Sequence, residues 1–275
     1  MSPKTPEKPS TKSRPRILAI ANQKGGVGKT TTAINLAAGL AAAGKSVLLI
    51  DLDPQGNAST GLGLDIQERG SGTYAFLAGT EPYEGLIRQT IVPGLRILPA
   101  RPELAGAEIE LVSAENREFV LREALASLLR GSTKYDFILI DCPPSLGLLT
   151  VNALASADSV LVPLQCEFFA LEGVSHLVRT IERIKKNLNP KLRLQGIVLT
   201  MFDRRNNLSE LVASDARSFF GTQVYETIIP RNVRVSEAPS HGKPVILYDL
   251  RSPGAQAYVK LARELLRRER VEVAA

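Results

Sequence analysis

A glycine-rich stretch near the start of the chain has the residue types needed to bind polyphosphate. It reads Gln-Lys-Gly-Gly-Val-Gly-Lys-Thr-Thr over residues 23–31. Backbone amides of such a turn surround phosphate oxygens, while Lys29 can reach the terminal phosphates and the Thr30 hydroxyl can bind Mg²⁺. We therefore predict a nucleotide-binding loop. Its predicted phosphate-binding residues are Lys24, Gly25, Gly26, Val27, Gly28, Lys29, Thr30 and Thr31.

The loop departs from the usual phosphate-loop pattern at two positions. The pattern G-x-x-x-x-G-K-[ST] would place a glycine where this chain has Gln23, and Lys24 is an additional charge. The sequence therefore predicts a deviant form of the loop. Lys24 is either a solvated loop lysine or a side chain that reaches the nucleotide of a second subunit. The second interpretation predicts a homodimer with nucleotide sandwiched between two copies, in which Lys24 and Lys29 are both catalytic.

Two apolar stretches end in acidic residues that can complete such a site. Residues 48–50 are followed by Asp51 and Asp53, and residues 137–140 are followed by Asp141. Four apolar residues before an aspartate are typical of a Walker B strand, whose carboxylate holds the hydration shell of Mg²⁺. Alternate strand residues share a face, so we predict that Asp51 binds Mg²⁺ through a water and that Asp53 orients a second water. The alternative for Asp51 and Asp53 is a satisfied turn or cap.

These groups together predict phosphoryl transfer from ATP to water. Lys24, Lys29 and Mg²⁺ would offset negative charge on the γ-phosphate, while Asp53 aligns the attacking water. The sequence shows no other candidate acceptor. Kinases and ligases use the same residue types around phosphate, so residue types alone leave those classes open.

Positioning these residues requires a sheet whose carboxyl edge carries all three segments. Apolar stretches typical of buried parallel strands alternate with stretches whose apolar residues recur every three or four positions, as in amphipathic helices. The alternation predicts an α/β fold with a doubly wound, mostly parallel sheet, helices on both faces and a ligand at the carboxyl ends of the strands. The predicted strands are 17–21, 47–50, 95–98, 137–140, 160–162 and 197–199. The predicted helices are 31–43, 115–130, 171–188, 208–220 and 255–268, and 57–94 is assigned to loops and short helices.

Length and composition fit one folded domain preceded by a tail. The chain has 275 residues, of which 44% are apolar, enough for a single layered domain over residues 17–275. Residues 1–16 mix prolines with lysines and serines, which predicts a disordered basic tail. This tail has five basic residues and one acidic residue, so it accounts for +4 of the net charge of +6. Overall basicity is therefore weak evidence for nucleic-acid binding.

The cysteines, histidines and hydropathy disfavour several other classes of protein. Cys142 and Cys166 are too few for a disulfide framework or a four-cysteine metal site, and His176 and His241 lie far apart in sequence. No apolar stretch is long enough to span a membrane, and the N-terminus lacks the apolar core of a signal peptide. We expect a cytoplasmic protein with reduced, buried thiols.

Three motifs together resemble those of the ParA-type partition ATPases. They are the loop at 24–30, Asp-Leu-Asp-Pro-Gln-Gly-Asn at 51–57 and Asp-Cys-Pro-Pro-Ser at 141–145. The likeness continues through 163–173, 200–206 and 229–240, covers nearly everything after residue 16, and is that of the chromosomal, Soj-like group. The resemblance implies an ATP-driven sandwich dimer that binds double-stranded DNA without sequence preference. It also implies association with the nucleoid and release when a ParB-type centromere-binding protein stimulates hydrolysis.

The resemblance also implies roles for individual residues at the nucleotide. Lys24 matches the signature lysine of the family, which crosses to the phosphates of the partner subunit. Asp53 matches the acid associated with hydrolysis. Pro230 and Asn232 fall where related proteins contact the adenine.

DNA binding is implied for two arginines. Arg205 and Arg234 match basic positions implicated in the Soj-like group, and each can pair with phosphate without reading sequence. The alternative is a pair of solvated loop arginines. Arg204, Arg231 and Lys243 could extend the same basic patch.

Four other interpretations stay open. A MinD-like division-site regulator shares this loop but docks on membrane through a C-terminal amphipathic helix. Residues 267–275 lack the bulky apolar face that insertion needs, so we expect no stable membrane association. A relative of the nitrogenase iron protein would need cluster-binding cysteines from both subunits. The remaining alternatives are a DNA-bound scaffold or repressor that does not hydrolyse ATP, and a small-molecule ligase or kinase.

Overall fold

The computed structural model describes residues 14–167 and 170–274. Most of the predicted tail therefore lies outside the described residues. Arg16, which the sequence assigned to that tail, is instead the first residue of a strand and pairs with Phe137.

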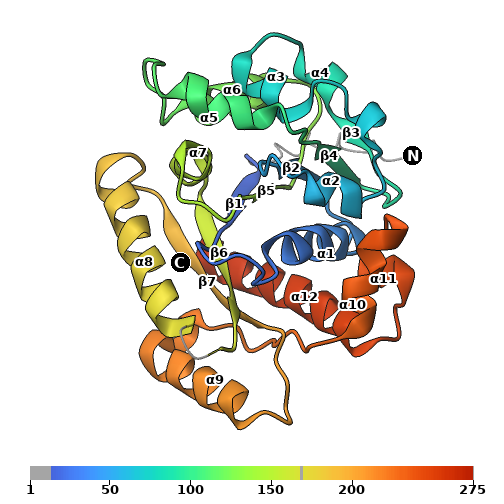
Figure 1. The fold of residues 1–275 in the computed structure, drawn as a ribbon, viewed down its shortest axis with the longest axis vertical. Helices are drawn as coiled ribbons and strands as arrows, with labels where there is room; N and C mark the ends of the chain where they lie inside the picture. The colour runs from blue at the N-terminus through green and yellow to red at the C-terminus, as the bar shows by residue number, and fades with distance from the viewer. Residues whose placement is uncertain (1–13, 168–169, 275) are drawn as a thin grey trace, which may run out of the picture.

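The described residues form one seven-stranded sheet in the order β3-β4-β2-β5-β1-β6-β7 (Figure 1). Every neighbouring pair is parallel except β3 and β4, which are antiparallel. The doubly wound, mostly parallel sheet predicted from the sequence is thus confirmed. The strands are β1 (Arg16–Ile20), β2 (Val47–Asp51), β3 (Arg88–Gln89), β4 (Leu95–Leu98), β5 (Phe137–Asp141), β6 (Ser159–Gln165) and β7 (Arg193–Thr200).

Helices cover both faces of the sheet and build two hydrophobic cores. The α-helices are α1 (Lys29–Ala42), α2 (Asn57–Gly61), α3 (Gly72–Ala78), α4 (Tyr83–Leu86), α5 (Leu104–Leu111), α6 (Val120–Arg130), α7 (Leu148–Ser156), α8 (Ala170–Asn187), α9 (Asn207–Phe220), α10 (Val233–Glu237), α11 (Val245–Tyr248) and α12 (Pro253–Ala274). Three short 3-10 helices are η1 (Ile66–Arg69), η2 (Gly221–Gln223) and η3 (Ala238–His241).

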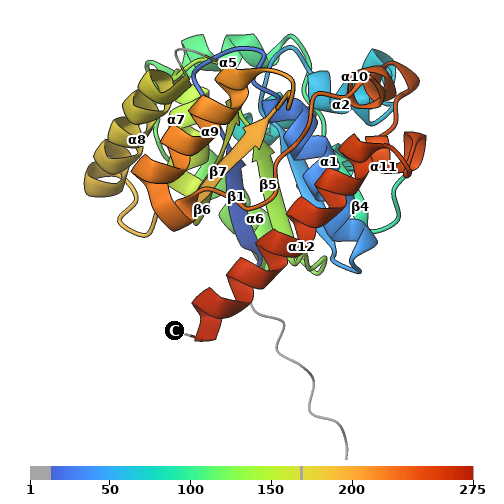
Figure 2. The ribbon, with the colours of Figure 1, turned by 90° about the horizontal axis from the view of Figure 1, so that it is seen from below.

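Alternation along the strands divides the apolar residues between the two cores. In β1, Leu18 and Ile20 enter the core shared with α1, α11 and α12, whereas Ile17 and Ala19 enter the core shared with α3 and α5 to α9. Figure 2 shows α1 and α12 side by side on one face. They pack so closely that a Cβ added at Gly39 of α1 would lie 2.9 Å from the Cβ of Ala262.

Several element predictions need correction. The helix predicted over 115–130 begins only at Val120, because Asn116 has φ 54° and interrupts the chain before it. Helices α5 and α7 and strand β3 were not predicted as such. Most residues of α7 are buried, so its apolar positions show no helical period, and β3 has only two residues. The predicted helix 255–268 extends to Ala274. Within the described ranges, no helix combines the length and apolarity needed to cross a bilayer.

Candidate functional site

The loop between β1 and α1 lies at the carboxyl edge of the sheet and is open above its glycines. Gly26 and Gly28 have φ 75° and 87°, a left-handed conformation that residues with a side chain rarely adopt. A Cβ added at Gly25 or Gly26 would meet no described atom within 4 Å. Gly28 is the N-cap of α1, and no side chain caps the first turn of this helix. Those amides are therefore available to an anion.

Two polar side chains from other segments hold this loop in place. The Thr200 hydroxyl at the end of β7 donates to the Val27 carbonyl at 2.8 Å. The Asn22 amide donates to the Pro163 carbonyl at 2.8 Å and accepts from the Lys24 N–H at 3.1 Å. Neither Asn22 nor Thr200 was predicted as a site residue, because each is a lone polar residue whose partner is distant in sequence.

Lys29 lies inside the loop, as its predicted role requires. It is only 6% exposed, and its Nζ donates to the Lys24 carbonyl at 3.0 Å. Burial lowers the pKa of Lys29, while nearby Asp141 and Asp53 oppose that shift. The ammonium is thus already placed at the floor of the open space, where terminal phosphates would be bound.

Asp141, at the end of β5, is a buried carboxylate close to the Thr30 hydroxyl and Lys29. It is fully buried, and neither carboxylate oxygen has a hydrogen-bond partner among the described residues. Burial raises the pKa of Asp141 well above its usual value and Asp51 adds to the rise, whereas Thr30 and Lys29 oppose it. A buried acid left unpaired beside a threonine hydroxyl fits a bound cation.

Magnesium matches this arrangement better than a metal held by protein alone. In the part of the chain that the structure describes, no three or more His, Cys, Asp and Glu side chains form a metal-binding group. Mg²⁺ typically takes one or two protein ligands and completes its shell with water and substrate phosphates. The residues that would hold it are Thr30 and Asp141.

Asp51 has a different environment from Asp141, although both end neighbouring strands and pair in register. Its Oδ2 accepts from the Ser59 N–H at 2.8 Å and from the Ser59 hydroxyl at 2.6 Å, and its Oδ1 accepts from the Asp53 N–H at 3.3 Å. Burial raises the pKa of Asp51 to about 6. These contacts tie β2 to α2, and the water-mediated role of Asp51 at Mg²⁺ stays a prediction.

Asp53 lies near the same charges without being fully enclosed. It is 7% exposed, and its Oδ1 accepts from the Gln55 N–H at 3.0 Å, which closes a turn after β2. Its charge also influences the pKa of Lys29, Asp51 and Asp141. The structure therefore brings Asp53 into the acid and lysine cluster that the sequence predicted.

Lys24 lies on the outer side of the loop. Its side chain is 45% exposed and forms an ion pair with Glu167, which is equally exposed. The neighbouring Gln23 contacts the His176 ring at 3.0 Å. The two lysines of one loop therefore lie in different surroundings, Lys29 inside and Lys24 at the surface.

Pro230 and Asn232 lie beside the end of β7, close to the loop. Phe202 forms a parallel bridge with Pro230 and accepts the Arg231 N–H at 3.0 Å. Asn232 caps α10 by accepting from the Val235 N–H at 3.3 Å. This segment therefore lies beside the carboxyl end of β7, the same end from which Thr200 contacts the loop.

Comparison with known proteins decides the family. Residues 15–194 match the family model described as an AAA domain. A chromosome partitioning protein ParA from Caulobacter vibrioides is 60% identical over 255 residues, covering 93% of this chain and 95% of that protein. The sporulation initiation inhibitor protein Soj from Bacillus subtilis is 52% identical over 250 residues, covering 91% and 98%. The chain belongs to the ParA/Soj family of chromosome-partitioning proteins.

Solved structures share the fold of this ParA/Soj chain. The crystal structure of cobyrinic acid a,c-diamide synthase from Mycobacterium smegmatis, with bound ADP and magnesium, is 39% identical with a TM-score of 0.80, and the match covers 93% of this chain and 96% of that one. The cell division ATPase MinD from Pyrococcus furiosus is 29% identical with a TM-score of 0.76, covering 92% and 98%. The family and fold predicted from the sequence are confirmed.

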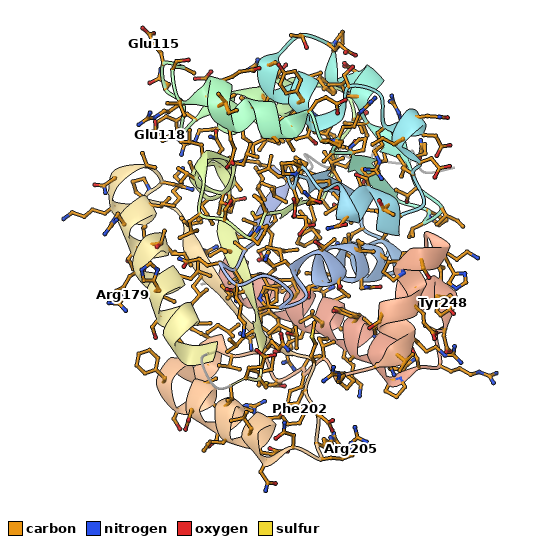
Figure 3. The ribbon with its side chains drawn as sticks, in the orientation of Figure 1. Glu115, Glu118, Arg179, Phe202, Arg205 and Tyr248 are labelled. Atoms are coloured by element: carbon orange, nitrogen blue, oxygen red, sulfur yellow. The ribbon has the colours of Figure 1, made fainter. Side chains whose placement is uncertain are left out.

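The two arginines assigned to DNA by the ParA/Soj resemblance are exposed but paired with acids. Arg205 donates to both carboxylate oxygens of Asp203, at 3.0 and 2.8 Å, and these bonds lower the pKa of Asp203 to about 2. Arg234 pairs with Glu237 at 2.9 Å and with Asp249 at 3.5 Å. Figure 3 shows Arg205 pointing away from the molecule, beyond Phe202. Arg204, Arg231 and Lys243 are also exposed.

Both cysteines of this ParA/Soj chain are buried, Cys142 fully and Cys166 to 6% exposure. Burial raises the pKa of both thiols, to about 11 for Cys166. Neither thiol is presented at the surface as a ligand for a cluster shared with a second subunit.

Proposed function

We propose that this chain is an ATP-dependent DNA-partitioning ATPase. With ATP and Mg²⁺ it forms a sandwich homodimer and binds double-stranded DNA of the nucleoid without sequence preference. Hydrolysis stimulated by a ParB-type centromere-binding protein releases it. The observation that carries the proposal is the placement of the two loop lysines, since Lys29 is 6% exposed and Lys24 has a side chain that is 45% exposed. Lys29 binds the phosphates of the nucleotide in its own subunit, and Lys24 contacts the phosphates of the nucleotide in the second subunit.

Hydrolysis uses the acids and lysines gathered at the carboxyl edge. A water attacks the γ-phosphorus as the bond to the β–γ bridging oxygen breaks, which yields ADP and inorganic phosphate. Asp53 accepts a hydrogen bond from that water and orients it. Lys29, together with Lys24 of the partner subunit, donates to the phosphate oxygens on which negative charge collects. When bound at Thr30 and Asp141, Mg²⁺ supplies further positive charge to the phosphates.

Relatives support ATP and Mg²⁺ as ligands. A protein from Treponema pallidum that is 51% identical over 254 residues is named a chromosome-partitioning ATPase. A Mycobacterium smegmatis structure that is 39% identical contains an ATP analogue and magnesium. A putative plasmid partition protein from Borrelia burgdorferi, 25% identical with a TM-score of 0.75, was solved with AMPPNP.

The remaining roles follow from position and charge. Pro230 and Asn232 contact the adenine, because their segment runs beside the strand end that braces the loop. Arg205 and Arg234 bind DNA phosphates, with Arg204, Arg231 and Lys243 extending the patch. To bind phosphate oxygens, Arg205 must release Asp203, and Arg234 must release Glu237 and Asp249.

The deciding experiment measures DNA binding by the purified protein with ATP, with ADP and without nucleotide, on two duplexes of unrelated sequence. We expect binding only with ATP, equal on both duplexes and absent in Lys24→Ala. Arg234→Glu should lose DNA binding and keep ATP binding. Arg179→Glu, the same charge reversal on the exposed face of α8, should keep both.

Each other outcome removes a separate part of the proposal. Unchanged DNA binding in Arg234→Glu would remove that arginine from the interface. No DNA binding in any nucleotide state, together with ATP-dependent co-sedimentation on anionic liposomes, would favour a MinD-like protein. ATP binding would stand in either case.

A further inference from the structure

A buried arginine, Arg69, lies beside the turn that carries Asp53. It is the last residue of η1 and is only 5% exposed. Its guanidinium packs against the backbone of Gly56, because a Cβ added at Gly56 would lie 2.2 Å from the Arg69 Nη1. Gly56 also has φ 64°, which favours glycine for a second reason. The arginine side chain therefore fills the space next to the end of the Asp53 turn.

The guanidinium of Arg69 donates to neutral oxygens of three separate segments. Nε and Nη2 donate to the Leu64 carbonyl, after α2, at 3.2 and 3.1 Å. Nη1 donates to the Ala100 carbonyl, after β4, at 3.1 Å. Nη2 also donates to the Thr60 hydroxyl, within α2, at 2.7 Å. Arg69 thus joins η1 to α2 and to the segment that follows β4.

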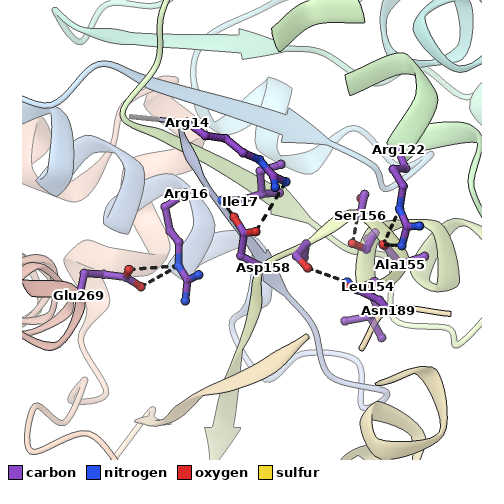
Figure 4. A network of polar contacts seen from close by, with 12 residues as sticks. Arg14, Arg16, Ile17, Arg122, Leu154, Ala155, Ser156, Asp158, Asn189 and Glu269 are labelled. Atoms are coloured by element: carbon purple, nitrogen blue, oxygen red, sulfur yellow. Dashed lines mark hydrogen bonds and ion pairs between the residues drawn. The ribbon is translucent and has the colours of Figure 1, made fainter. Parts of the chain in front are cut away.

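These partners leave the charge of Arg69 without a carboxylate, which is unusual for a buried arginine. Arg16, by contrast, pairs with Glu269 of α12 at 3.0 Å (Figure 4). Burial lowers the pKa of Arg69, and the nearby charge of Asp51 opposes that shift. Removing a guanidinium from water is costly, but its several donors can hold oxygens from different segments at fixed positions. The geometry that Arg69 fixes is therefore the reason to look for its role.

Thr60 connects Arg69 to the Asp53 turn. The Thr60 hydroxyl, which accepts from Arg69, donates to the Gly56 carbonyl at 3.1 Å. The Gly56 N–H donates to the Asp53 carbonyl at 2.9 Å, and the Gln55 N–H donates to the Asp53 Oδ1 at 3.0 Å. A continuous path of hydrogen bonds therefore leads from the buried guanidinium to the turn that holds the Asp53 carboxylate.

Ser59 ties the same region to β2 and to the segment after β4. Its hydroxyl donates to the Asp51 Oδ2 at 2.6 Å and accepts from the Ala100 N–H at 3.0 Å. Ala100 thus binds Ser59 through its N–H and Arg69 through its carbonyl. The turn at 53–56 therefore lies between a strand end and a helix that are both anchored to one residue.

We propose that Arg69 is a positioning residue for ATP hydrolysis, which sets the place of the Asp53 carboxylate through Thr60 and Gly56. The inference rests on the proposed function, in which Asp53 orients the attacking water. Arg69 touches neither the nucleotide nor the water. It keeps the carboxylate at hydrogen-bonding distance from the water, where a displacement of about 1 Å slows a reaction strongly. Nucleotide binding, which uses the loop at 24–31, should not depend on Arg69.

The first test is amide hydrogen exchange in the nucleotide-free protein, read by mass spectrometry on peptides that cover 53–60. Arg69→Met keeps an unbranched side chain and removes the donors, so these amides should exchange faster. Thr60→Val removes the connecting hydroxyl and keeps the other bonds of Arg69, and it should act in the same direction even if Arg69→Met does not fold. Arg88→Met is the matched control, because Arg88 donates to the Glu68 carbonyl of the same 3-10 helix at 2.9 Å. It should leave exchange at 53–60 unchanged.

The second test separates ATP binding from hydrolysis. A fluorescent ATP analogue should bind Arg69→Met with unaltered affinity, while the single-turnover rate of hydrolysis falls by about tenfold. Arg69→Lys, which keeps a charged donor, should recover part of that rate. In Asp53→Asn, the slow residual rate should not fall further when Arg69→Met is added, because both changes act on the same water.

Each contrary outcome has a separate meaning. Unchanged exchange at 53–60 in both Arg69→Met and Thr60→Val would overturn the inference and leave the proposed function intact. A loss of rate from Arg69→Met that is equally large in Asp53→Asn would show that Arg69 does not act through Asp53. Weaker binding of the ATP analogue with an unchanged rate would make Arg69 a purely structural residue. An unaltered protein that binds ATP without hydrolysing it would refute the proposed function, while faster exchange in Arg69→Met would still connect Arg69 to the Asp53 turn.

Discussion

At the scale of single residues, Asp141 combines a cost for folding with the proposed role in binding Mg²⁺. Its carboxylate is fully buried, and neither oxygen has a hydrogen-bond partner among the described residues, which is unfavourable for a charged group. Asp141→Asn removes the charge and keeps the shape. We expect the free energy of unfolding without nucleotide to stay equal or rise by about 1–2 kcal/mol. The extra stability that ATP with Mg²⁺ provides should disappear.

Thermal unfolding with and without ATP and Mg²⁺ measures both effects of Asp141→Asn. Asp215→Asn, at an exposed position of α9, is the matched control and should behave like the unaltered protein. A full Mg²⁺-dependent rise in melting temperature in Asp141→Asn would show that this acid does not hold the metal.

The ion pair of Lys24 with Glu167 competes with the proposed contact to a second subunit. Glu167→Gln should free Lys24, so dimers should form at a lower ATP concentration. Both side chains are 45% exposed, so the expected change is modest, roughly two- to fivefold. Analytical ultracentrifugation across ATP concentrations measures it, with Glu182→Gln on the exposed face of α8 as the control. An unchanged midpoint would mean that the pair does not restrain Lys24.

Residues to which we assign a chemical role were easier to single out from the sequence than residues that hold the loop in place. The sequence marked Lys29, Thr30 and Asp141 because phosphate and Mg²⁺ binding demand those residue types at fixed places in a loop or at a strand end. Asn22 and Thr200, which hold the loop, carried no such mark. Their roles depend on partners across the sheet, such as Pro163, which is 141 residues from Asn22.

At the scale of elements, prediction succeeded where a helix has one exposed face. Helices α8 and α9 have apolar residues every three or four positions, and the sequence predicted both within one residue or so of their bounds. Helix α7 was not predicted because it is buried on most sides, so its sequence lacks the regular spacing of polar residues that marks an exposed face. Strand β3 was missed because it forms only by pairing with β4, a partner that lies outside any local pattern.

Helix α12 is attached to the segment after β7 by one buried acid, Glu264. Burial acts to raise the pKa of Glu264, but N–H donors of Thr227 and Glu226 and the Arg268 guanidinium hold that pKa below its usual value. A lowered pKa stabilises the fold above the ordinary pKa of glutamate, and this contribution is lost as the pH falls through the lowered value.

Glu264→Gln should therefore reduce the free energy of unfolding by about 1–3 kcal/mol at pH 7. The difference from the unaltered protein should shrink below roughly pH 4, where the acid becomes protonated. Urea unfolding at both pH values measures it. Glu226→Gln, with a side chain that is 78% exposed, is the control and should differ little at either pH. If the difference in free energy of unfolding between Glu264→Gln and the unaltered protein is the same at both pH values, the contacts of Glu264 do not depend on its charge.

At the scale of the whole molecule, the proposed DNA binding through phosphates predicts a strong dependence on salt. The logarithm of affinity should fall linearly with the logarithm of salt concentration, and loss of one phosphate contact should reduce the slope by about 0.9. We expect this reduction in Arg205→Ala and in Arg234→Ala, measured on random-sequence DNA with ATP. Arg179→Ala should keep the original slope. Equal slopes in all variants would place the DNA-binding surface elsewhere.

The overall architecture was predictable because each βα unit repeats one physical requirement. A parallel strand buried on both faces needs a covering helix before the next strand can join the sheet. The apolar stretches at β2 and β5 therefore predicted covering helices as well as the strands themselves. What the alternation of elements did not predict was the bulge between β6 and β7, which leaves Gln195 out of the ladder.

The two outer strands of the sheet, β3 and β7, are closed to further strands over part of their length. At one edge β3 has two residues, and at the other the N–H groups of Tyr225 and Ile229 donate to the Ile197 and Leu199 carbonyls of β7, both at 2.8 Å. Open edges invite pairing between molecules and lead to aggregation. Partial closure of both outer strands reduces strand pairing between copies of this chain, so copies that bind close together on DNA, as the proposed function requires, should be able to separate again.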